Sequence, residues 1–350
     1  MDLTIFELPI AGSQVSTIER YLASRGVLLA AFSENPNVVC AVSTYLKQQA
    51  VHNTTTFMLI DRQILSFIKQ IATGGTIPDA SRKLVSSIMC FAILSHIRLE
   101  PNMAVYEYAD ANNSDHAWQD VSILRYADNL DCSIWHSLFL GTSSAIPSPW
   151  RSSAQIQQPP HGVNFQQRPR PFDFCLPFVL KLALLERTGK KPIQKMIEYL
   201  DWMHEEYFFG VSGVLFGNLF LSPSRESKMI KNVGAVDRSK RLSGIRNACW
   251  DITLVQQWLE YVKKQSAANR LWLLCSADRA LVRTAERIFE SQAASLKKSF
   301  EDDWGFASGS TLFKHYLCLQ STLEIARRPA NQNLPPAHWE HLRNTLEAQI

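Results

Sequence analysis

Phe57-Met58-Leu59-Ile60-Asp61 and Leu271-Trp272-Leu273-Leu274-Cys275-Ser276-Ala277-Asp278 are the two stretches that decide the fold of this 350-residue chain. Each begins with a short apolar run, typical of a buried strand, and ends at an aspartate. An amphipathic pattern follows each aspartate, over residues 62–72 and 279–295, and predicts a helix. The other segments are mostly helical in pattern. The sequence therefore predicts an α/β fold, in which a small parallel sheet is surrounded by many helices.

The composition predicts a folded protein in an aqueous compartment. The chain is 46% apolar and 19% charged, which excludes a disordered or fibrous chain. Its net charge of +4 does not by itself indicate nucleic-acid binding. No apolar run reaches the roughly 20 residues of a membrane-spanning helix, and the N-terminus lacks the cationic start of a signal peptide. We expect a soluble, cytoplasmic protein without a membrane partner.

Several enzyme classes are disfavoured because their motifs are missing. The sequence has no P-loop, no G-x-G-x-x-G after a strand, no G-x-S-x-G and no H-E-x-x-H. Its seven cysteines are scattered and include no C-x-x-C pair, which argues against a disulfide framework or a structural zinc site.

Acidic residues stand at positions where an α/β fold binds ligands. Asp61 and Asp278 each follow a predicted strand, and Asp251 is expected to open a helix over residues 250–264. The carboxyl ends of parallel strands meet at one edge of a sheet, so these carboxylates are expected to converge there. Gathered carboxylates favour a divalent cation such as Mg²⁺ or Mn²⁺. Each aspartate alone also has a structural interpretation, because Asp is a favoured helix N-cap.

The order of these acids resembles that of a PIN-type nuclease domain. In that family an Asp after the first strand, a Glu on a following helix and two later Asp residues converge on one or two divalent metal ions that cut RNA or DNA. The resemblance implies that Asp61, Glu107, Asp251 and Asp278 take these four places as catalytic and metal-binding residues, in that order. The match after Leu271–Cys275, Ser-Ala-Asp-Arg-Ala-Leu, is the most specific. Glu100, Asp120 and Asp128 are the alternatives for the second acid.

The resemblance covers residues 55–110 and 245–296, which we interpret as a PIN-like core. Residues 1–54 are then an N-terminal helical appendage, and residues 297–350 are C-terminal helices. Residues 111–244 form a large helical insertion, which contains a Pro- and Gln-rich loop and a basic segment. The sequence departs from the family directly after Asp61, where Arg62 and Gln63 replace the usual small hydroxyl or amide residue.

The basic segment runs into the predicted position of Asp251. Its positive charge outweighs Glu226 and Asp237, and a flexible cationic segment beside a carboxylate site suits capture of a phosphate backbone. A solvated loop that keeps the protein soluble is an equally good interpretation. Trp150, in the Pro- and Gln-rich loop, is the one aromatic side chain expected to be available for stacking on a base. The candidate nucleic-acid-binding residues are Arg225, Lys228, Lys231, Arg238, Lys240, Arg241 and Arg246.

Two functions follow from this sequence. The first is a metal-dependent nuclease, a phosphodiester hydrolase acting on RNA in preference to single-stranded DNA, for which a toxin-like or defence role would fit. The second is a non-catalytic helical scaffold that binds nucleic acid or protein through a degenerate PIN-like core.

Overall fold

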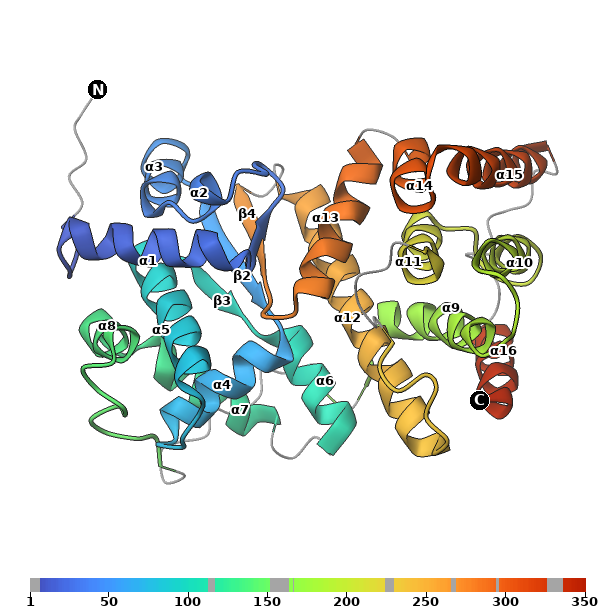
Figure 1. Cartoon of the computed structure of the whole chain (residues 1–350). Coiled ribbons are helices and arrows are strands. Elements are labelled where there is room, and N and C mark those ends of the chain that lie inside the picture. Colours follow the sequence, from blue (N-terminus) through green and yellow to red (C-terminus); the bar gives the residue numbers. More distant parts are fainter. Residues whose placement is uncertain are drawn as a thin grey trace. The chain divides into compact units, whose positions relative to one another are not determined.

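The computed structural model describes residues 7–112, 117–151, 164–165, 167–223, 230–265, 269–293, 296–325 and 336–350. The chain forms two compact units. Unit 1 comprises Met1–Arg168 and Trp258–Val282, and unit 2 comprises Pro169–Gln257 and Arg283–Ile350. Figure 1 shows the elements of both units along the chain.

A mixed four-stranded sheet forms the centre of unit 1, with the strand order β1-β4-β2-β3. The strands are β1 (Leu28–Ala30), β2 (Thr55–Ile60), β3 (Arg98–Glu100) and β4 (Arg270–Cys275). The predicted strands around Phe57 and Leu271 are therefore confirmed, and β2 pairs in parallel with both β3 and β4.

The prediction of a purely parallel sheet is wrong at one edge. β1 pairs antiparallel with β4, with Leu28 opposite Cys275 and Ala30 opposite Leu273. This strand comes from the range that we expected to form only a helical appendage. Its three residues are all buried, so it covers the edge of β4 with apolar side chains.

The helices of unit 1 bury apolar faces around this sheet. In α4, which follows β2, the expected stripe of Ile64, Leu65, Ile68 and Ile71 is buried. β2, β3 and β4 run in the same direction in Figure 1, and α4, α6 and α13 begin near their carboxyl ends. The helices of this unit are α1 (Gly12–Arg25), α2 (Pro36–Val39), α3 (Val42–His52), α4 (Arg62–Ala72), α5 (Asp79–Leu94), α6 (Asn102–Asn112), α7 (Ala117–Asp128) and α8 (Cys132–Leu140).

In the residues described for unit 2, the regular elements are all helical. Asn218 is fully buried there and joins two elements: its Nδ2 donates to Asp303 Oδ2 at 2.6 Å, and its Oδ1 accepts the indole N–H of Trp304 at 2.7 Å. The helices that lie wholly in this unit are α9 (Arg170–Glu186), α10 (Pro192–Glu205), α11 (Val211–Leu221), α14 (Leu296–Trp304), α15 (Phe306–Ile325) and α16 (Pro336–Gln349).

Two helices belong partly to each unit. α12 (Arg238–Lys264) passes from unit 2 to unit 1 after Gln257, and α13 (Arg279–Ala293) passes from unit 1 to unit 2 after Val282.

α12 begins much earlier than the sequence led us to expect. We predicted a helix from Trp250, but the helix starts at Arg238. The Asp237 carboxylate caps it by accepting the Ser239 N–H at 2.8 Å, and the Arg and Lys residues that follow are good helix formers. Gly244 is needed within this helix because a Cβ there would lie 1.8 Å from the carbonyl oxygen of Lys231. The basic residues from Arg238 to Arg246 are therefore helical rather than part of a flexible loop.

None of the helices in the described part of the chain combines the length and the apolar character needed to cross a bilayer.

Candidate functional site

Asp61 lies where β2 ends and α4 begins. Its Oδ1 accepts the Ile64 backbone N–H at 2.7 Å, so Asp61 is the N-cap of α4. Its Oδ2 accepts the hydroxyl hydrogen of Ser276, and the backbone N–H of Ala277 donates to the same carboxylate. Only 8% of Asp61 is exposed. The carboxylate is therefore buried and held by donors from both strand ends.

Asp278 lies two residues beyond Ser276, at the start of α13. Its backbone N–H donates to Ser276 Oγ at 3.0 Å, and its Oδ1 accepts the N–H groups of Ala280 at 2.9 Å and Leu281 at 3.4 Å. Asp278 is thus the cap of its helix, as Asp61 is of α4. Both the structural interpretation and the predicted convergence of these two aspartates hold in this geometry.

The strand register explains why the two acids meet. Ile60 pairs with Cys275 in the parallel ladder, and the Asp61 N–H continues it by donating to the Cys275 carbonyl at 3.1 Å. The residues that follow the two strands are therefore neighbours at the carboxyl edge of the sheet. Ser276 connects them, although the sequence interpretation assigned it no role. The signal for it was its place in Ser-Ala-Asp, where a serine can bond the backbone N–H two residues later.

The environment of Asp61 disfavours its negative charge. Burial raises the pKa of its carboxyl above the usual 3.8, and the charge of Asp278 raises the pKa further. The donors Ser276, Ile64 and Ala277 act in the opposite direction without cancelling the effect. A proton or a cation at this edge would relieve the unfavourable charge.

Glu107 lies on α6, a helix that packs against α4. Its Oε1 is 3.3 Å from Nη1 of Arg62, the residue directly after Asp61. The guanidinium of Arg62 thus links Glu107 to the first residue of α4.

The three residues that were alternatives to Glu107 as the second acid differ from it in burial and in their partners. Asp120 is almost completely buried and forms an ion pair with Lys69 of α4. Glu100 ends β3 and accepts the Asn102 N–H at 3.1 Å, while burial raises the pKa of its carboxyl. Asp128 ends α7 and is exposed.

Asp251 does not open a helix. It lies within α12, well after the first turn at Arg238, and its side chain is half-buried in unit 2. The N-cap interpretation for this residue is therefore wrong, because Asp237 takes that place.

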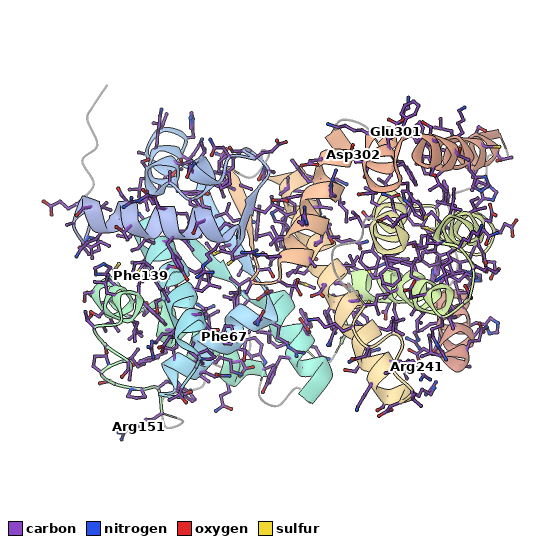
Figure 2. All side chains as sticks on the ribbon, viewed as in Figure 1. Phe67, Phe139, Arg151, Arg241, Glu301 and Asp302 are labelled. Atoms are coloured by element: carbon purple, nitrogen blue, oxygen red, sulfur yellow. The ribbon has the colours of Figure 1, made fainter. Side chains whose placement is uncertain are left out.

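The predicted nucleic-acid-binding residues differ in their exposure and in their hydrogen bonds. Arg241, labelled on α12 in Figure 2, is buried. Its guanidinium donates to the carbonyl oxygens of Ala235, Val236 and Ile350, which is a structural role. Arg238 is exposed and donates to the Glu347 carbonyl at 2.8 Å.

Three further basic side chains are exposed, those of Lys231, Lys240 and Arg246. Arg225 and Lys228 lie outside the described residues. Trp150, which we expected to be available for stacking, is 9% exposed and belongs to the core of unit 1, and its backbone N–H donates to the Ala72 carbonyl at 2.7 Å.

Two carboxylates are suitable oxygen ligands for a divalent cation, but they do not form a complete coordination shell. Within the described residues, no group of three or more His, Cys, Asp or Glu side chains is placed to hold a metal ion. Mg²⁺, however, is commonly held by one or two carboxylates and keeps most of its water ligands. Asp61 and Asp278 would be the two carboxylates of such a site.

Comparison of the chain with protein-family models, with curated proteins and with solved structures finds no match.

Proposed function

We propose that this chain is a metal-dependent nuclease that hydrolyses phosphodiester bonds of RNA, or of single-stranded DNA, at the edge formed by Asp61 and Asp278. The observation that carries the proposal is the position of Asp61 and Asp278 at the ends of the adjacent parallel strands β2 and β4, where Ser276 bonds the carboxylate of the first and the backbone N–H of the second. Ligands in α/β sheets bind outside the carboxyl ends of the strands, and β2 and β4 are neighbours there.

In this proposal Asp61 and Asp278 hold Mg²⁺ or Mn²⁺, which when bound supplies a Lewis acid and an activated water. The raised pKa of Asp61 supports this assignment, because a bound cation would favour the ionised carboxylate. Ser276 fixes the Asp61 oxygen by its hydroxyl bond. Glu107, which belongs to the same unit, remains a further candidate ligand from the resemblance to PIN-type nucleases. Exposed Lys231, Lys240 and Arg246 are the candidates for contacts with the phosphate backbone.

A second candidate is a non-catalytic scaffold that binds nucleic acid or a protein partner. The observation that favours it is that the Asp61 carboxylate already accepts three hydrogen bonds, while Arg62 already pairs with Glu107. These bonds would hold the edge together without a metal ion, and the carboxylates would then be helix caps alone.

Cleavage of labelled single-stranded RNA and DNA, in Mn²⁺ or in EDTA, tests the two candidates. The informative variant is Asp278→Asn, since Asn removes the negative charge but remains a good N-cap. The matched control is Asp131→Asn, which makes the same change at the exposed cap of α8, where Oδ1 accepts the Ser133 N–H at 2.7 Å.

We expect wild type and Asp131→Asn to cleave in Mn²⁺ and not in EDTA, and Asp278→Asn to lose cleavage while unfolding at the same temperature. Calorimetric titration with Mn²⁺ should show binding to wild type and a loss of binding in Asp278→Asn. Absence of both cleavage and Mn²⁺ binding in wild type would reject the nuclease and leave the scaffold. Glu107→Gln, assayed in parallel, tests whether this carboxylate belongs to the same site.

A further inference from the structure

A polar pocket opens at the end of the sheet opposite to the carboxylates. It has a volume of about 180 Å³ and lies where β2 and β3 begin. A single water needs only about 10–15 Å³ of such volume, so the pocket has room for a polyatomic ligand. β2 is six residues long, which separates the pocket from Asp61 by roughly 17 Å at about 3.3 Å per residue. Its lining consists of Tyr45 and Gln49 of α3, residues 54–56, Ser95, His96 and Arg98.

The pocket contains a buried hydroxyl that lacks a partner. Ser95 is 2% exposed, and within the described residues its Oγ makes no hydrogen bond. A buried hydroxyl without a partner is costly, so native proteins usually provide one. Ser95 is among the residues that line the pocket, but its Oγ has almost no accessible surface, so a rotation about its Cα–Cβ bond would have to bring the hydroxyl to a ligand there.

The charge of the lining is positive. Arg98 is exposed at the start of β3 and forms no ion pair within the described part of the chain. The lining includes no Asp or Glu, whereas the three threonines at 54–56 add hydroxyl donors. Guanidinium and hydroxyl groups are the donors that bind phosphate-like oxyanions.

His96 is held at the pocket in a conformation that favours glycine. Its φ is 52°, in the left-handed region, at the turn that ends α5. The turn is closed by the Ile97 N–H, which donates to the Ala92 carbonyl at 2.8 Å, and glycine is the usual residue at such a position. The imidazole Nδ1 lies 3.0 Å from Gln49 Oε1, and this contact orients the ring. Strain of this kind is a reason to look for a function of the side chain.

The negative ends of two helices near the pocket are partly satisfied by hydrogen bonds. α3 and α5 both end there, and a helix C-terminus carries a partial negative charge. Carbonyls of both final turns are already used. Gln48 accepts the Thr54 N–H at 3.3 Å, and Phe91 accepts the Ser95 N–H at 3.0 Å.

We propose that this pocket binds a small oxyanion, either inorganic phosphate or a phosphate monoester, through Arg98 and Ser95. The site is separate from the carboxylate edge, so it stands whether or not the chain is a nuclease. It would make the chain responsive to a small phosphorylated compound at the far end of β2.

Calorimetric titration of the full chain with inorganic phosphate, and separately with glycerol phosphate, tests the proposal. We expect both probes to bind wild type, with the tighter one identifying the source of the phosphate group. Arg98→Gln should weaken binding by at least about tenfold, because it removes a charge-assisted contact. Ser95→Ala should weaken binding by a few-fold, since only one hydroxyl contact is lost.

Arg20→Gln is the matched control, because Arg20 is exposed on α1 of the same unit and does not line the pocket. It should bind phosphate as wild type does, and so should Asp278→Asn, which separates this site from the proposed nuclease site. Unfolding temperatures of all variants establish that they are folded. No binding of either probe to wild type at millimolar concentration, or equal binding by Arg98→Gln, would overturn the proposal.

Discussion

The hydroxyl of Ser276 donates to Asp61 Oδ2 and accepts the backbone N–H of Asp278 at 3.0 Å. One buried side chain therefore connects the ends of β2 and β4 and organises both aspartates. Ser276 is 1% exposed, so neither of its bonds competes with bulk water. The strand register brings these two helix caps from distant parts of the sequence together, and Ser276 bonds both of them.

Ser276→Ala should lower the free energy of unfolding by about 1–3 kcal/mol, because the buried Asp61 carboxylate and the Asp278 N–H both lose a partner. Urea denaturation measures the change. Ser13→Ala, at an exposed position of α1, is the control and should stay within about 0.5 kcal/mol of wild type. An equally small effect at Ser276 would contradict the role assigned to its hydroxyl.

Asp61 should make the protein less stable as the pH rises. Burial, and then the charge of Asp278, raise the pKa of its carboxyl above 3.8, so the native state binds the proton more tightly than the unfolded chain does. The resulting stabilisation is complete below pH 3.8 and is lost as the pH rises through the native pKa. The Asn side chain of Asp61→Asn does not titrate. As the pH rises from 3.8 through the native pKa of Asp61, the free energy of unfolding of this variant should therefore increase relative to that of wild type.

Urea denaturation at a series of pH values measures this difference. Asp131→Asn provides a control of opposite sign. Hydrogen bonds from Ser133 lower the pKa of Asp131, so its ionised form stabilises the native state above the usual pKa of 3.8, and this stabilisation is lost as the pH falls. Relative to wild type, Asp131→Asn should therefore lose stability as the pH rises. A pH-independent difference for Asp61→Asn would show that burial does not perturb this carboxyl.

The ion pair between Lys69 and Asp120 should be costly to break from one side. The two side chains are 18% and 3% exposed, and Lys69 Nζ also lies 4.1 Å from the centre of the Tyr108 ring. Lys69→Met leaves the buried carboxylate without this cation and should lower the free energy of unfolding by about 3–5 kcal/mol. The double variant Lys69→Met/Asp120→Asn should lose less than the sum of the two single variants. Additive losses in this cycle would mean that the pair is not coupled.

Two substitutions at His96 can separate backbone strain from the loss of the imidazole. His96→Gly and His96→Ala both remove the contact with Gln49, but only glycine adopts a φ of 52° without a steric penalty. The glycine variant should therefore be more stable than the alanine variant by about 1 kcal/mol. Thermal unfolding in the absence of phosphate compares them, and equal stabilities would refute the strain at this position.

The sequence was most informative where local signals and burial agreed. The short apolar runs before Asp61 and Asp278 predicted β2 and β4, and the helical period of the apolar stripe in α4 predicted its buried face. The role of Asp61 and Asp278 as helix caps could be predicted from residue type and position. The prediction that the two aspartates lie near each other required only that β2 and β4 be parallel neighbours.

Other features depend on contacts that a local pattern does not contain. β1 has only three residues, and its antiparallel pairing is defined by β4, which is far away in the sequence. Arg241 was a candidate for binding phosphate, yet its guanidinium bonds carbonyl oxygens that the fold brings to it. Trp150 lies in a Pro- and Gln-rich stretch, but it is buried in the hydrophobic core of unit 1, to which this stretch belongs. The start of α12 was missed because the basic segment was interpreted as a flexible segment or a solvated loop, whereas Asp237 caps a helix there.

The short strands at the two edges of the sheet also bear on how copies of this chain behave in a crowded solution. β1 and β3 each have three residues, whereas the inner strands β2 and β4 have six. A short edge offers few unpaired backbone groups to a strand of another molecule, and the charged Arg98 and Glu100 on β3 make that edge still less receptive. The most aggregation-prone segments, the apolar runs of β2 and β4, are therefore shielded from edge-to-edge polymerisation for as long as β1 and β3 remain in place.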